Sequence, residues 1–96
     1  MKAIIKRVGQ PPVMEEIENE LQALQTAVGG YIETVQIASD LLIICDEEGV
    51  LKGKDFNCRI AGYPFFGDLV LVGFEGEEFA DVPCDVRRLE KMRLFA

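Results

Sequence analysis

Histidine and tryptophan are absent from this 96-residue sequence, and serine occurs once, at Ser39. Without histidine, the chain lacks the side chain that most often acts as a general base and as a zinc ligand. A Ser-His-Asp triad and a Cys-His pair are also impossible. The enzyme classes that depend on these arrangements are therefore excluded.

Long apolar runs are missing as well, since none approaches the roughly 18 residues of a membrane span. Charged residues follow the first apolar pair too closely for a signal peptide. The three cysteines, Cys45, Cys58 and Cys84, show no Cys-x-x-Cys spacing, which is typical of reduced thiols in a reducing compartment. We expect a cytoplasmic protein without membrane contact.

What the sequence does contain is an apolar content of 49% with 28% charged residues, which predicts a single folded domain over residues 1–96. The net charge of −7 is uneven, because residues 15–81 carry 15 acidic and 3 basic side chains. Phosphate backbones are bound by Lys and Arg, so we expect no direct nucleic-acid binding. The acidic middle is either a solvated face or a surface for a basic partner.

The N-terminal third predicts two strands and a helix. Residues 2–8 are rich in β-branched side chains and precede a glycine and two prolines, as a strand before a turn would. Residues 12–17 fit both a helical period and a period of two. Asn19 is a good helix cap and Gln22 lies three residues on, as in a capping box. This favours a helix over 20–28 and a second strand, in a hairpin with the first, over 12–17.

The predicted helix has an apolar stripe of Leu21, Leu24 and Val28. Gly29 and Gly30 follow, and glycine at this place closes a helix by taking the left-handed conformation. No phosphate-binding glycine motif surrounds the pair. We therefore interpret the two glycines as a helix stop.

Three further strands are expected at 31–37, 41–45 and 69–74. The last two have no polar position, which predicts that they are central in the sheet and paired with each other. Residues 50–68 show no sustained period and are predicted to be a loop. In it, Asn57 and Arg59 are expected to hold the backbone by side-chain hydrogen bonds.

Aromatic side chains of the same loop, Tyr63, Phe65 and Phe66, are expected to pin it to the core. Acidic residues at 75–78 predict a turn. A terminal helix is expected from Pro83, with an apolar face made of Val82, Val86, Leu89 and Met92.

These elements predict an α+β fold. Its order is strand, strand, helix, strand, strand, strand, helix, and its sheet is a single, mostly antiparallel layer of about five strands with both helices packed on one face.

Few side chains are candidates for chemistry. Carboxylates are adjacent at 46–48 and at Glu77–Glu78, where they could act as acid and base or bind a hard cation, although neither run matches a calcium loop. Cys45 lies in an apolar strand, which predicts an inert thiol, and Cys84 is the one thiol expected at a helix start. No cofactor and no metal are predicted.

Several blocks together resemble one family: LQ-x-x-VGGYIE-x-V over 24–35, the apolar strand ending in CDEEG at 45–49, Asn57, and Gly67 before an apolar strand. They are similar to the domain of unknown function 3846 family, small proteins of bacteria, phages and mobile elements. The chain departs from that family's Gly-Leu-Pro before the asparagine, having Gly-Lys-Asp-Phe, and its loop after Arg59 is short. The resemblance implies a cytoplasmic accessory protein and supports the strand at 12–17, and it implies no activity.

Our main hypothesis is a non-enzymatic protein-binding or regulatory factor. Its partner-binding residues would be Asp46, Glu47, Glu48, Asn57 and Arg59. One alternative is an acidic nucleic-acid mimic that blocks a DNA-binding enzyme. Another is a small enzyme or cation-binding domain that uses the acidic turn. A homodimer is also possible, because two apolar strands need cover and an exposed sheet edge invites a partner.

Overall fold

The computed structural model describes residues 1–91, which hold eight strands and two helices. They follow one another as β1 (Lys2–Lys6), β2 (Val13–Glu16), α1 (Leu21–Val28), β3 (Ile32–Ala38), β4 (Leu41–Asp46), β5 (Phe56–Ile60), β6 (Tyr63–Phe66), β7 (Leu69–Glu75), β8 (Glu78–Ala80) and α2 (Val86–Lys91). The α+β class is confirmed, and the strands are more numerous than the sequence predicted.

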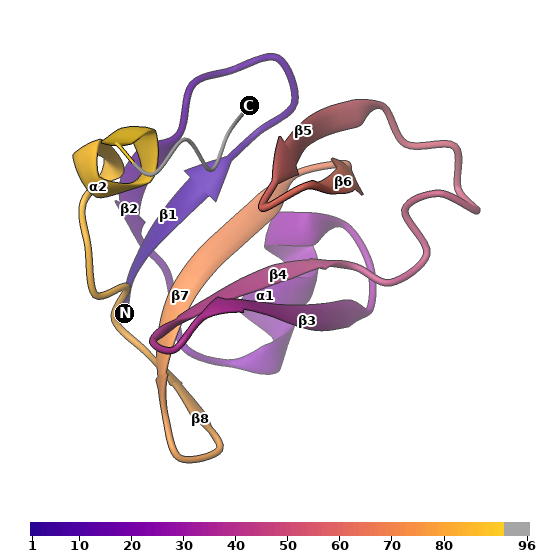
Figure 1. The fold of residues 1–96 in the computed structure, drawn as a ribbon. Coiled ribbons are helices and arrows are strands. Elements are labelled where there is room, and N and C mark those ends of the chain that lie inside the picture. Colours follow the sequence, from indigo (N-terminus) through magenta and orange to yellow (C-terminus); the bar gives the residue numbers. More distant parts are fainter. Residues whose placement is uncertain (92–96) are drawn as a thin grey trace.

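One antiparallel sheet organises the chain, with the strand order β2-β1-β7-β4-β3 and with β8 added to the end of β7 (Figure 1). The hairpin of β1 and β2 is confirmed, although β1 ends at Lys6 rather than at residue 8. The two apolar strands, β4 and β7, are central and pair with each other as predicted. Their position explains the lack of polar residues, because both of their faces are covered.

The alternation of side chains along β4 and β7 divides the core in two. Ile43 and Leu71 lie on one face, in a cluster that includes residues of β5, β6 and α2. Ile44 and Val70 lie on the other face, under α1. Successive side chains of a strand point to opposite faces, so a continuous apolar run supplies both clusters.

The two helices therefore lie on opposite faces of the sheet, and the expectation that both pack on one face is wrong. Leu24 and Val28 of α1 contribute to one cluster, whereas Leu89 of α2 contributes to the other. The sequence pattern of a helix shows that it has an apolar face but not which side of a sheet that face meets.

Helix α1 begins at Leu21, one residue later than predicted, and Asn19 does not cap it. The cap position is held by Glu20 without a side-chain hydrogen bond. The Asn19 amide instead donates to the carbonyl of Phe79 at 2.8 Å, and so ties the start of the helix to β8. Leu21 was expected in the apolar stripe, but it is 57% exposed. Burial of Leu24 and Val28 is confirmed.

The helix stop at the glycine pair is confirmed. Gly29 has a left-handed backbone with φ of 77°, which glycine adopts without strain. Its N–H and that of Gly30 donate to the carbonyl of Gln25 at 2.8 and 3.1 Å. The last turn of α1 is thereby closed as in common glycine C-caps.

Residues 50–68 were predicted to be a loop, and this is wrong for their second half, where β5 and β6 form an antiparallel hairpin. The strands are joined at Ala61 and Gly62, both with positive φ. Of the aromatic side chains expected to pin this region, Phe65 is buried and Phe66 half-buried, while Tyr63 is 61% exposed. The hairpin covers the α2 face of the sheet (Figure 1).

Helix α2 begins at Val86 rather than near Pro83, and Asp85 accepts a hydrogen bond from the backbone N–H of Arg88 at 3.1 Å. The Arg88 guanidinium binds both carboxylate oxygens of Asp40, at 3.2 and 3.3 Å. The predicted face residues Val82 and Leu89 are buried. The remaining ones are Val86, which packs against the same cluster, and Met92, which lies outside the described residues.

Neither helix in the described part of the chain is long and apolar enough to cross a membrane.

Candidate functional site

The acidic turn after β4 begins with a carboxylate that is fully buried. The side chain of Asp46 has 0% exposure and forms ion pairs with Lys54 Nζ at 2.8 Å and with Lys52 Nζ at 3.0 Å. Its other oxygen accepts the backbone N–H of Glu48 at 2.9 Å, as Asp side chains do when they begin a turn. Two lysines and one amide therefore satisfy this group.

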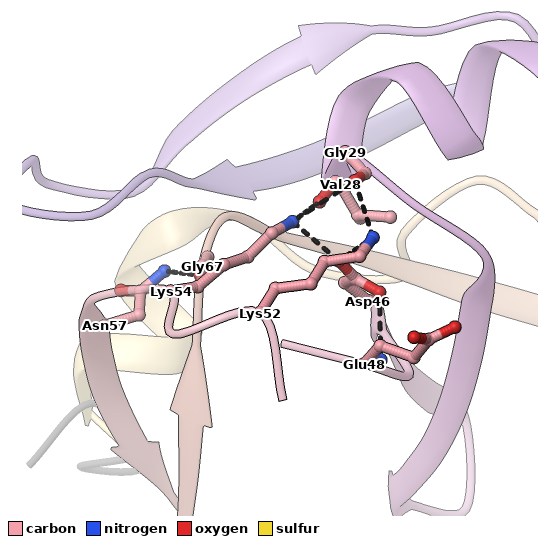
Figure 2. A network of polar contacts seen from close by, with 8 residues as sticks. All are labelled: Val28, Gly29, Asp46, Glu48, Lys52, Lys54, Asn57 and Gly67. Carbon is pink, nitrogen blue, oxygen red and sulfur yellow. Dashed lines mark hydrogen bonds and ion pairs between the residues drawn. The ribbon is translucent and has the colours of Figure 1, made fainter. Parts of the chain in front are cut away.

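The same lysines bind the end of α1 (Figure 2). Lys54 Nζ donates to the carbonyl of Val28 at 2.6 Å, and Lys52 Nζ donates to the carbonyl of Gly29 at 3.3 Å. The carbonyl end of a helix carries partial negative charge, which favours ammonium groups there. We call these residues, Val28, Gly29, Asp46, Lys52 and Lys54, the Asp46 cluster. It fastens the loop after β4 to the C-terminus of α1.

Glycine at position 30 makes this cluster possible. A β-carbon there would come within 2.6 Å of both Asp46 carboxylate oxygens and 2.5 Å of Lys52 Nζ. Gly29 and Gly30 thus have different roles, since Gly29 supplies the left-handed turn and Gly30 leaves room for the buried carboxylate. The interpretation of the pair as a helix stop accounts for Gly29 and for the bond of the Gly30 N–H to Gln25, but it missed the space that Gly30 leaves for the carboxylate.

The pKa of Asp46 is lowered well below its usual value. Burial by itself would raise it, but the hydrogen bonds from Lys54, from the backbone of Glu48 and from Lys52 outweigh the burial. The carboxylate is therefore charged at neutral pH and neutralised by lysines of its own chain. This argues against the cation-binding hypothesis at Asp46, because an external cation would have to displace two ammonium groups. Within residues 1–91, no group of three or more His, Cys, Asp or Glu is placed to hold a metal ion.

Asn57 also stabilises the fold, by hydrogen bonds to two other segments of the chain. Its amide donates to the carbonyls of Lys6 at 2.8 Å and Gly67 at 2.7 Å, and its oxygen accepts from Lys6 Nζ at 2.9 Å. The predicted hydrogen bonding of Asn57 to backbone is confirmed, and it joins the end of β1 to the turn before β7. Arg59 is exposed on β5, and in the described chain its side chain makes no hydrogen bond or ion pair, so its predicted bond to backbone is not found.

The five predicted site residues therefore do not form one constellation. Figure 2 shows the side chain of Lys54 lying between Asn57 and Asp46. Asp46 and Asn57 stabilise the fold, and Glu48 contributes a backbone N–H. Glu47 is exposed, and it forms no ion pair within the described residues. Asp46 and Glu47 both line a cavity, and of these two Glu47 is the exposed one.

That cavity is a groove between the β3–β4 side of the sheet and the β5–β6 hairpin, with a volume of about 230 Å³. Its apolar floor includes Val35, Cys45 and Phe65, and two carboxylates, Glu33 and Glu47, lie on its lining. The complete lining is Glu33, Val35, Cys45, Asp46, Glu47, Gly49, Val50, Tyr63, Pro64, Phe65 and Phe66. We call it the acidic groove. Sequence reasoning missed it because its second wall is the hairpin that was predicted to be a loop.

The walls of the acidic groove include apolar side chains that face solvent. Val50 is 69% exposed and Tyr63 is 61% exposed, and they come from the loop after β4 and from β6. Neighbouring exposed apolar side chains around a concavity are typical of interaction sites. The volume is below the roughly 300–1,000 Å³ of small-molecule sites, so the groove has room for one or two side chains rather than for a whole cofactor.

The thiol in the floor of the groove is not activated. Burial raises the pKa of Cys45 to about 11, and the nearby charges of Glu33 and Asp46 add to this effect. The predicted inertness of this thiol is thereby supported. Cys84, the one thiol expected at a helix start, precedes α2 by two residues, and burial raises its pKa as well.

Neither the curated proteins nor the solved structures contain a match to this chain. The family described as "Domain of unknown function (DUF3846)" matches residues 1–94, which is nearly the whole sequence. This agrees with the resemblance carried by the VGGYIE block and the CDEEG turn, and the chain therefore belongs to the DUF3846 family.

Proposed function

We propose that the protein is a binding module that holds a segment of a partner protein in the acidic groove. The observation that carries this proposal is the combination of an apolar floor with two carboxylates, Glu33 and Glu47, that have no cationic partner within the described residues. The chain neutralises its buried carboxylate, Asp46, with its own lysines and leaves these two open.

The size of the groove favours a peptide over a metabolite. A space of about 230 Å³ accommodates one or two side chains, while the remainder of the ligand would lie outside it. An apolar side chain from the partner would lie on Val35 and Phe65. Burial of one such side chain contributes roughly 1.5–3 kcal/mol, which suits a modest, reversible affinity.

The charge of the groove favours a basic partner. A lysine or arginine close to the apolar side chain would pair with Glu33 or Glu47, and charge complementarity of this kind sets specificity and association rate. We place this function in the cytoplasm, supported by three free cysteines, and regard it as non-enzymatic. The family resemblance favours an accessory role in a phage or mobile element.

The test is selection from a displayed library of random ten-residue peptides, followed by calorimetric titration of the selected sequences. We expect sequences with a basic residue near an apolar one. Reversing the groove charge in the double variant Glu33→Lys/Glu47→Lys should weaken their binding by about tenfold or more.

The matched control is Glu77→Lys, which reverses an exposed charge in the turn between β7 and β8. It should leave the affinity unchanged. A library that yields no binder contradicts the proposal, and so does a selected peptide that binds the groove variant as tightly as the natural protein.

A further inference from the structure

The acidic groove lies beside a strand that has an open edge. Among the described residues, β3 is the last strand of the sheet and pairs only with β4. We propose that the partner segment binds as an added strand along β3, with alternate side chains entering the acidic groove. This inference rests on the proposed function, and it specifies how the same groove recognises its ligand.

The hydrogen bonding of β3 shows which of its groups are available. The N–H of Glu47 donates to the carbonyl of Tyr31 at 3.0 Å, so this opposed pair is a hydrogen-bonded one. Hydrogen-bonded and non-hydrogen-bonded pairs alternate in an antiparallel ladder. The register opposes Thr34 to Ile44, and Thr34 therefore directs its N–H and C=O away from β4. Ile32 and Gln36 lie two residues to either side of Thr34, so their N–H and C=O groups also point away from β4.

These outward groups form a row at the free edge. In the described chain, the backbones of Ile32, Thr34 and Gln36 have no hydrogen-bond partner on that side. Strand β3 is regular from Ile32 to Gln36, since its register shift comes only after Gln36. Main-chain bonds to such an edge supply affinity in β-augmentation, and pockets for alternate side chains supply specificity.

Side-chain direction connects the edge to the groove. Glu33 and Val35 line the groove, whereas Ile32 packs on the α1 face of the sheet. An added strand places every second side chain on the groove face, beside Glu33 and Val35. The predicted ligand therefore has a lysine or arginine two residues from an apolar residue, in an extended segment. The positive charge of this lysine or arginine complements the open carboxylates of Glu33 and Glu47.

The opposite edge of the sheet, β2, is better protected against strand addition than β3. Strand β2 has four residues and follows Pro11 and Pro12, while β3 has seven. Short edge strands and adjacent prolines are common devices against strand addition. The groove is lined by β3 and not by β2. These differences favour β3 as the docking edge.

The test is Thr34→Pro, using peptides selected as above. Proline removes an outward N–H and fills the edge, and a strand tolerates it there because this N–H is not needed for pairing with β4. We expect the affinity to fall by about tenfold or more. Thr34→Val is the control, because it keeps the N–H, and it should bind like the natural protein. Circular dichroism checks that both variants are folded.

Amide hydrogen exchange provides a second measurement that does not depend on a variant. Peptide binding should slow exchange at Ile32, Thr34 and Gln36. One outcome would overturn strand addition while the groove proposal stands. In it, the peptides lose affinity for Glu33→Lys/Glu47→Lys, but they bind Thr34→Pro as tightly as the natural protein and do not slow exchange at these three amides. Light scattering that shows a dimer dissociated by Thr34→Pro would assign the edge to a second copy and overturn the choice of partner.

Discussion

Asp46 and Glu47 are neighbours in one acidic turn and have opposite roles. Asp46 is fully buried and bound by two lysines that also hold the end of α1. Glu47 is exposed on the lining of the acidic groove. A run of acidic residues is therefore not one functional unit, because the chain binds the first carboxylate with its own lysines and leaves the second exposed.

The largest effect is expected from removing the buried charge. In Asp46→Asn, the two lysines lose their carboxylate, and we expect the free energy of unfolding to fall by about 2–4 kcal/mol. The isosteric change Glu47→Gln should alter it by less than about 0.5 kcal/mol, as for exposed positions generally. Urea unfolding of both variants measures the contrast. Equal losses in the two variants would remove the distinction between these neighbours.

The two lysines of the Asp46 cluster should also differ. Lys54 is 23% exposed and donates to Val28 at 2.6 Å, whereas Lys52 is 40% exposed and makes a longer bond to Gly29. We expect Lys54→Met to lower the free energy of unfolding by about 1–2 kcal/mol and Lys52→Met by less than 1 kcal/mol. The same urea titrations check the ranking, and a larger loss for Lys52→Met would contradict it.

A smaller effect is expected in the pH dependence of the free energy of unfolding. Because the pKa of Asp46 is lowered in the folded protein, its stabilisation is complete above the unfolded carboxyl pKa near 4 and is lost as the pH falls toward the folded value. The stability difference between the natural protein and Asp46→Asn should be constant from pH 7 to 5. By pH 3 it should shrink by about 1 kcal/mol. A difference that grows on acidification would be inconsistent with a charged, lysine-bound carboxylate.

Much of the sheet could be predicted from the sequence because its signals are local. The apolar runs of β4 and β7 predict central strands, and Gly29 predicts the end of α1, as the structure confirms. The β5–β6 hairpin was missed for two reasons. Its turn places Ala61 at φ of 50°, where glycine or asparagine would have been the signal, and Pro64, a residue that disfavours strands, lies within β6.

The candidate site was harder to predict because it depends on contacts between distant elements. Lys52 and Lys54 carry no motif, and their role appears only when the end of α1 lies against the loop after β4. The capping box at Asn19 failed for a related reason, because β8 offered the carbonyl of Phe79 as a partner. Tertiary contacts outweighed local propensity in both places.

The central claim is that Asp46 stabilises the fold whereas Glu47 binds the partner. The most direct test measures the affinity of one selected peptide for Asp46→Asn and for Glu47→Lys, at a temperature where both variants are folded. We predict that Glu47→Lys loses about tenfold in affinity while Asp46→Asn stays within about threefold of the natural protein. A larger loss in Asp46→Asn than in Glu47→Lys would show that the buried carboxylate, and not the open groove, determines binding.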